Sequence, residues 1–231
     1  MQKLKNKILQ ENKYKKLLHN EIEIKYVDMP TKNVDVNKVL KRLEDLIPLF
    51  MIEEHVEKII FGNFDFFKKR DYNAFYDPKA KIIYIRSEQQ DDNLDLMDDL
   101  IHEMSHAVEN KYKNYIYSDG RIKSEFVLKR LKLFYQIVID YGDKISSKKF
   151  LFTSYDEELD NFFYKTVGYE KMKKYIKNIF PSAYSPTSLS EYWAEGFEKY
   201  LLGDKSDLLS MCPRLYSKIN SFYKRGNKND I

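Results

Sequence analysis

Residues 91–113 read DDNLDLMDDLIHEMSHAVENKYK and hold the most informative pattern of the chain. The apolar residues of this stretch recur every three or four positions, which predicts a helix with one buried face. Acidic residues at the start suit a helix N-terminus, where the helix dipole favours negative charge. We expect the helix to run from about residue 91 to about residue 113. It contains the pattern H-E-x-x-H at residues 102–106.

This pattern places two imidazoles and a carboxylate together. At 100° per residue, His102 and His106 lie about 40° apart on the helix surface, and Glu103 flanks them. On a helix, H-E-x-x-H supplies two zinc ligands and a base that takes a proton from a zinc-activated water. We therefore predict one catalytic zinc ion, with Glu103 as the general base. Two surface histidines bonded to neighbouring groups are the alternative interpretation.

A catalytic zinc site needs a third protein ligand. The metzincin extension of the motif requires Gly at position 109 and His at position 112, but the chain has Glu109 and Tyr112. His19 and His55 both precede the motif. A carboxylate on a later helix must therefore supply the third ligand.

The best candidate segment is 190–197, SEYWAEGF. Glu191 and Glu195 lie one turn apart on a helix whose other residues indicate substantial burial. Buried carboxylates are costly unless they are paired or bind metal. One of the two can ligate zinc while the other accepts the N–H of a ligating imidazole. An exposed acidic face is the alternative interpretation, and the other acidic candidates for the third ligand are Glu157, Glu158 and Asp160.

Short segments upstream of the motif are rich in β-branched and aromatic residues, at 56–61, 72–76 and 81–86. Residues 77–80, DPKA, form a turn signal between the last two. The pattern predicts a small sheet whose last two strands form a hairpin. Helical patterns cover 3–18, 36–47, 123–141, 156–166, 170–180, 191–202, 207–211 and 213–223, and a loop is expected over 181–190.

The motif HEMSH followed by EYWAEGF resembles the gluzincin metallopeptidases, and most of all the anthrax lethal factor and Pro-Pro endopeptidase family. The resemblance covers roughly residues 43–202. It implies an α+β, mostly helical zincin-like domain with a small mixed sheet, an active-site helix and a second, glutamate-bearing helix. It also implies His102, His106 and Glu191 as the zinc ligands, and Glu195 as the carboxylate that supports them.

The same resemblance implies a tyrosine seven residues before the ligating glutamate, and Tyr184 stands there. In the family this side chain points at the zinc-bound substrate. We therefore expect Tyr184 to donate a hydrogen bond to the developing oxyanion. Asp99 and Glu109, each about one turn from a histidine, are candidates to orient the ligands.

The resemblance further implies an edge strand that aligns an extended peptide above the metal. We expect this strand to be 81–86, where Ile83, Tyr84 and Ile85 would pair with substrate by β-augmentation. One departure from the family is length, because 85 residues separate His106 from Glu191. We expect a helical insertion at about 120–180 within one domain over 31–231, preceded by a basic helical segment over 1–30.

Composition limits the partners. The 231 residues carry 40 basic and 36 acidic side chains, a near balance that predicts no nucleic-acid partner. No run approaches the roughly 18 apolar residues of a membrane helix, so no membrane span is expected. Cys212 is the only cysteine, which excludes an internal disulfide. The first residues lack a secretory signal, which predicts a cytoplasmic protein, or a secreted one if this is a mature fragment or uses another export route.

These features predict a zinc-dependent endopeptidase that acts on a peptide or protein substrate. Two alternatives share the fold. One is an intracellular regulatory protease that cleaves a repressor-type protein. The other is a catalytically silent, lethal-factor-like domain used for binding or toxin delivery.

Overall fold

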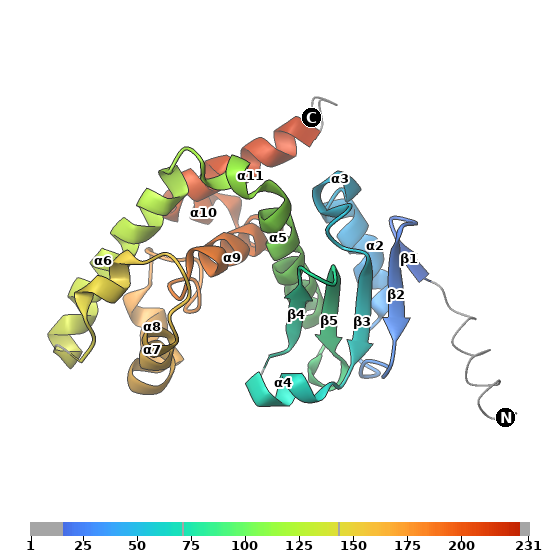
Figure 1. Ribbon diagram of the computed structural model, residues 1–231, viewed down its shortest axis with the longest axis horizontal. Coiled ribbons are helices and arrows are strands. Elements are labelled where there is room, and N and C mark those ends of the chain that lie inside the picture. The colour runs from blue at the N-terminus through green and yellow to red at the C-terminus, as the bar shows by residue number, and fades with distance from the viewer. Residues whose placement is uncertain (1–15, 71, 143, 227–231) are drawn as a thin grey trace, which may run out of the picture. The chain divides into compact units, whose positions relative to one another are not determined.

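The computed structural model describes residues 16–70, 72–142 and 144–226 (Figure 1). The protein is α+β and mostly helical, with one small mixed sheet, as predicted. Its chain divides into two compact units, Met1–Lys111 and Tyr112–Ile231. This boundary falls inside the predicted domain 31–231, whose limits stay a prediction. Among the described residues, no helix combines the length and apolar character needed to cross a bilayer.

The sheet of the first unit has five strands in the order β1-β2-β3-β5-β4. Strands β2, β3 and β5 run parallel, while β1 and β4 pair antiparallel at the two edges. The predicted hairpin of 72–76 and 81–86 is confirmed, because β4 pairs antiparallel with β5. The bounds of the strands are Lys16–Leu18 for β1, Ile22–Tyr26 for β2, Lys58–Gly62 for β3, Ala74–Asp77 for β4 and Ile82–Arg86 for β5.

The first two strands correct the predicted helical segment. Residues 16–18 form β1 rather than the end of a helix over 3–18, and the rest of that helix lies outside the described residues. Residues 22–26 form β2, where Ile22 and Ile24 are buried while Lys25 is exposed. This two-residue alternation is typical of a strand with one covered face. The helical prediction for 1–30 is therefore wrong over these strands.

The position of β5 also corrects a prediction. Ile83 pairs with Ile59 of β3 on one side and with Tyr76 of β4 on the other. Both hydrogen-bonding edges of the strand are therefore used within the sheet, and Ile83, Tyr84 and Ile85 cannot take up a peptide by β-augmentation. The edge strand next to β5 is β4 (Figure 1).

The described residues of the first unit also include three helices, one 3₁₀ turn and most of a fourth helix, α5, whose last residues belong to the second unit. Asp35 caps α2 by accepting the N–H of Lys38 at 3.1 Å, and Pro48 follows the end of that helix. Asp92 accepts the N–H groups of Leu94 and Asp95 at the start of α5. The elements are α2 (Val36–Leu46), α3 (Leu49–Ile52), α4 (Asp65–Arg70), η1 (Ser87–Gln89) and α5 (Asn93–Tyr117), the last departing from helical geometry at Tyr112.

All the regular elements described in the second unit are helices, joined by loops such as residues 176–188. Its elements are α6 (Arg121–Tyr141), η2 (Ser147–Leu151), α7 (Glu157–Asn161), η3 (Phe162–Val167), α8 (Tyr169–Tyr175), α9 (Leu189–Leu202), α10 (Lys205–Met211) and α11 (Pro213–Gly226). The predicted helix over 156–166 is α7 continued by the π-helical turn η3. The predicted helix over 170–180 ends early, at Tyr175, and Asn178 takes a left-handed conformation at φ 61°.

A buried carboxylate on α6 joins three helices of this unit. Glu125 is 8% exposed and accepts the Tyr192 hydroxyl of α9 at 2.8 Å. It also accepts the backbone N–H groups of Arg214 and Leu215 at the start of α11. These donors offset the cost of burying the charge, and the helix N-terminus further favours it. Helices α9 and α11 are therefore both fastened to α6.

Close packing of α9 against α11 depends on Gly196. A Cβ at this position would lie 2.2 Å from Cδ2 of the fully buried Leu215. We predict that Gly196→Ala lowers the free energy of unfolding by about 1–3 kcal/mol, because overpacking outweighs the better helix propensity of alanine. Urea unfolding measures the change. In a Leu215→Ala background the added methyl should be neutral or stabilising, and an equal loss there would contradict the packing explanation.

Candidate metal centre

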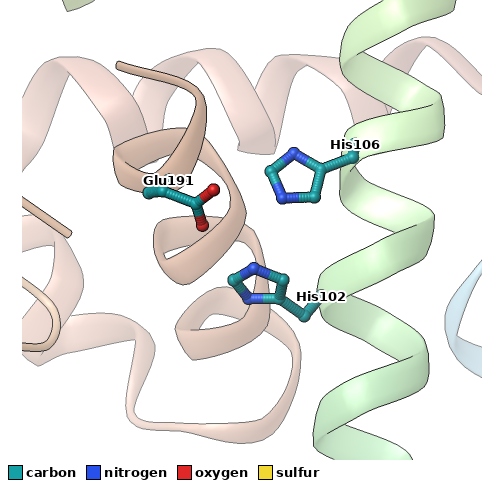
Figure 2. A group of neighbouring side chains, drawn as sticks. All are labelled: His102, His106 and Glu191. Atoms are coloured by element: carbon teal, nitrogen blue, oxygen red, sulfur yellow. The ribbon is translucent and has the colours of Figure 1, made fainter. Parts of the chain in front are cut away.

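Three side chains predicted as metal ligands lie together. One ligand atom from each of His102, His106 and Glu191 lies within 4.8 Å of the other two. Figure 2 shows the imidazoles on α5 and the Glu191 carboxylate on α9 directed toward one another. Each of the three residues is partly buried. The part of the chain that the structure describes holds no other group of three His, Cys, Asp or Glu at metal-binding distance, so Glu157, Glu158 and Asp160 are not part of such a group.

The two imidazoles come from successive turns of α5. Their ring centroids are 5.0 Å apart and the rings are inclined at 77°. Nδ1 of His106 lies 3.6 Å from Oε2 of Glu109, whose side chain is 13% exposed. This carboxylate therefore faces the Nδ1 side of the His106 ring. Glu109 thus lies near a predicted ligand, and its role in orienting that imidazole stays a prediction.

Other acidic groups on α5 lie close to the imidazoles. Glu103 is 9% exposed and stands beside His102 in the helix. Asp99 accepts a hydrogen bond from Nε2 of Gln90 at 2.7 Å. Burial raises the pKa of Asp99 to about 7, and the nearby carboxylates of Asp95 and Glu103 add to this effect. Asp99 therefore exchanges a proton near neutral pH.

The helix that carries Glu191 begins with a capping serine. The Ser188 hydroxyl accepts the N–H of Glu191 at 3.0 Å, so Glu191 lies in the first turn of α9. Its neighbours Tyr192 and Trp193 are fully buried, which fixes the face on which Glu191 lies. Glu195 follows one turn later and is partly buried. Its role behind the ligands stays a prediction.

One residue near these carboxylates was not predicted. Tyr169, at the start of α8, has its pKa raised to about 12 by burial, and the charges of Asp160, Glu195 and Glu191 contribute. The tyrosine therefore lies within electrostatic range of both glutamates of α9. Tyr169 carries no signal in the sequence, because it is one of 19 tyrosines and belongs to no recognised motif.

Tyr184 lies in the loop that precedes α9, as expected. Its backbone N–H donates to the Ser182 hydroxyl at 3.1 Å. Its carbonyl accepts both the N–H and the hydroxyl of Thr187, at 3.0 and 2.9 Å. Ser185 and Thr187 are almost fully buried. These bonds hold the backbone of Tyr184 in one conformation, while the role of its hydroxyl stays a prediction.

The three side chains fit a divalent metal ion. Two imidazole nitrogens and one carboxylate oxygen are ligands that transition metals accept, and their spacing lets a single ion reach all three. Cys212, the only cysteine of the sequence, is not in this group: it is buried between the end of α10 and the start of α11, and burial raises its pKa to about 11. The centre therefore offers three protein ligands, and four-coordinate zinc would keep one position for water or substrate.

Comparison with known proteins gives no relative. No family model matches the chain, and no match is found among curated proteins or among solved structures.

The ligand set predicts unequal effects of two similar substitutions. Glu191→Ala should weaken Zn²⁺ binding more than Glu195→Ala, because the first removes a ligand and the second removes only a supporting carboxylate. The loss for Glu195→Ala should be about 10- to 100-fold. Titration with Zn²⁺ against a competing chelator measures both. A larger loss of Zn²⁺ affinity in Glu195→Ala would make Glu195 the ligand and Glu191 the supporting carboxylate.

Asp99 predicts a pH dependence of stability in the metal-free protein. Its native pKa of about 7 exceeds the value of about 3.9 in an unfolded chain, so the native state binds more protons between these values. Stability therefore falls as pH rises through this window. Between pH 5 and pH 8, wild type should lose roughly 2 kcal/mol relative to Asp99→Asn, whose amide oxygen still accepts from Gln90. Urea unfolding at both pH values checks this, and a pH-independent difference would contradict it.

Proposed function

We propose that this protein is a zinc-dependent endopeptidase of the gluzincin type. The observation that carries the proposal is the group formed by His102, His106 and Glu191, with Glu103 beside it on α5. Two histidines and one glutamate are the ligand set of thermolysin-like zinc peptidases. The motifs that resemble the anthrax lethal factor and Pro-Pro endopeptidase family contribute all four residues.

Zinc in this centre would supply Lewis-acid activation of a water molecule at neutral pH. Glu103 then acts as the general base, taking a proton from the attacking water and passing it to the leaving amine. Glu103 as a whole residue is 9% exposed, so much of its surface is shielded from bulk water. Glu109 orients the His106 ring through its contact with Nδ1.

Tyr184 is proposed to stabilise the oxyanion that forms on the scissile carbonyl. The hydrogen bonds of its backbone to Ser182 and Thr187 limit the positions that its side chain can reach. A preorganised hydrogen-bond donor to the oxyanion lowers the activation free energy of such a reaction by about 3 kcal/mol. This role draws on its place seven residues before Glu191.

The free edge of the sheet is proposed to bind the extended substrate. Strand β4 occupies one edge of the order β1-β2-β3-β5-β4, so its outer backbone groups face no strand among the described residues. An added peptide strand would pair with these groups. The proposed substrate strand is thus Ala74–Asp77 in place of the 81–86 segment.

Replacing the proposed base separates metal binding from catalysis. Glu103→Gln should bind Zn²⁺ normally and lose at least about 100-fold of peptidase activity, because the amide cannot accept the proton. Digestion of a peptide library by the zinc-loaded protein, read by mass spectrometry, measures activity and cleavage preference. Glu57→Gln, the same chemical change at an exposed site in the first unit, is the matched control.

Substantial residual activity in Glu103→Gln would remove Glu103 from the role of base. Zinc binding without cleavage by the wild-type protein would favour the catalytically silent alternative.

A further inference from the structure

The N-terminus of α9 is joined to a distant segment of the second unit. The backbone N–H of Leu189 donates to the carbonyl of Thr153 at 2.8 Å. Leu189 is the first helical residue after the cap Ser188, and Glu191 follows two positions later. The first turn of α9, which carries the proposed third ligand, is therefore held from residue 153.

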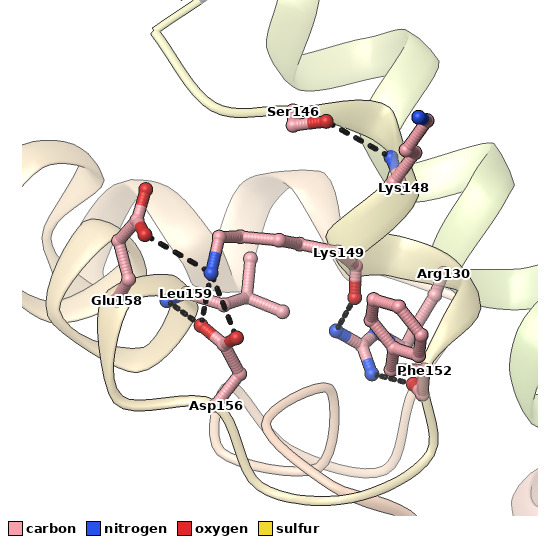
Figure 3. A network of polar contacts seen from close by, with 8 residues as sticks. All are labelled: Arg130, Ser146, Lys148, Lys149, Phe152, Asp156, Glu158 and Leu159. Carbon is pink, nitrogen blue, oxygen red and sulfur yellow. Dashed lines mark hydrogen bonds and ion pairs between the residues drawn. The ribbon is translucent and has the colours of Figure 1, made fainter.

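The segment that ends at Thr153 is fixed by a buried arginine. Arg130 of α6 is fully buried, and its Nη2 donates to the carbonyl of Lys149 at 2.9 Å while Nη1 donates to the carbonyl of Phe152. Figure 3 shows the guanidinium reaching both carbonyls. Phe152 directly precedes Thr153, so the arginine acts one residue away from the bond to α9.

Arg130 occupies an unusual environment for a cation. Its guanidinium lies 5.2 Å from the ring centroid of Phe126 and 5.7 Å from that of Phe150. Burial lowers its pKa to about 10, so it stays charged at neutral pH. Charged donors make the stronger class of hydrogen bond, and burial keeps water from competing for the two carbonyls. The described residues place no carboxylate in hydrogen-bond contact with it.

Lys149 fixes the other side of the same segment. Its Nζ lies 2.7 Å from Oδ2 of Asp156 and 3.0 Å from a carboxylate oxygen of Glu158 (Figure 3). Asp156 in turn caps α7 by accepting the N–H of Leu159 at 2.8 Å. Residues 149–153 are thus bonded to α6, α7 and α9.

We propose that Arg130 and residues 149–153 form a tether that sets the position of the metal ligand Glu191. Arg130 is then a positioning residue, because it acts through the carbonyl of Phe152, the bond from Leu189 to Thr153 and the first turn of α9. The inference rests on the metal site of the proposed function. Part of the long segment between His106 and Glu191 thus has a specific role, which is to position the third ligand.

Leu189→Pro tests the tether at its link to α9. Proline removes the N–H that donates to Thr153, yet it is well tolerated at the first position of a helix. The extended conformation of Ser188, at φ −154° and ψ 166°, also suits a residue before proline. Leu189→Ala is the matched control, because it shortens the side chain and keeps the N–H.

The readout is the affinity for Zn²⁺, measured by titration against a chelator on the full chain. Leu189→Pro should bind Zn²⁺ about tenfold more weakly than Leu189→Ala, in the range found when groups that orient a ligand are removed. In a Glu191→Ala background the two variants should bind equally, since the tether then has no ligand to position. Equal affinities in the wild-type background, or an equal loss in both backgrounds, would overturn the proposal.

Arg130→Met breaks the tether at its other end. It provides a second test of the proposal if Leu189→Pro does not fold. Replacing a buried ion by an apolar side chain of similar length is often tolerated. The same tenfold loss, absent in the Glu191→Ala background, is expected, and an unchanged affinity would contradict the tether. Because binding is measured without peptidase activity, wild type that binds Zn²⁺ but cleaves nothing would refute the proposed function and leave the tether standing.

Discussion

The placement of Glu191 is the constraint on which the rest of the structure depends. His102 and His106 need only one turn of α5 to lie together, with ring centroids 5.0 Å apart. Glu191 follows 85 residues later, and only tertiary packing brings its carboxylate within 4.8 Å of the imidazole nitrogens. A metal ion tolerates errors of only a few tenths of an ångström in its ligands. Groups that fix the first turn of α9 therefore bear on how well Glu191 can meet a metal ion.

Helix α6 supplies these groups through two buried charges. Glu125 accepts the Tyr192 hydroxyl, next to Glu191 in α9, and also caps α11. Arg130 donates to two carbonyls of the segment that bonds Leu189. Each charge is costly to bury unless its hydrogen bonds are made, so each selects one arrangement of the backbone around it. Both residues lie within the segment of about 120–180, which the family resemblance identified only as a helical insertion.

Local patterns predicted the elements that carry the site and missed those defined by pairing. The apolar spacing over 91–113 predicted α5, and the DPKA turn predicted the β4–β5 hairpin. Strand β1 was predicted as helix, because three residues beside a basic segment hold too little alternation to show a strand. The edge strand was also mispredicted, because the 81–86 segment was expected to have a free edge and β5 is paired on both sides. Strand β5 pairs in parallel with β3, and this pairing joins residues that are far apart in the chain.

Residue types and their local spacing can be read from the sequence alone. The two imidazoles with Glu103 on one helix and the pair of glutamates on a later helix follow from neighbours within a few residues. The cap at Ser188 was not predicted, because the helix was expected to begin at residue 191. The tertiary structure brings Glu191, the ligand implied by the resemblance, to the histidines, and it shows that β4 forms the edge of the sheet. It also shows that Arg130 is bonded to the segment whose Thr153 carbonyl accepts the N–H of Leu189. Helical periodicity acts within one element, whereas strand pairing and the burial of charge join residues that only the folded chain brings together.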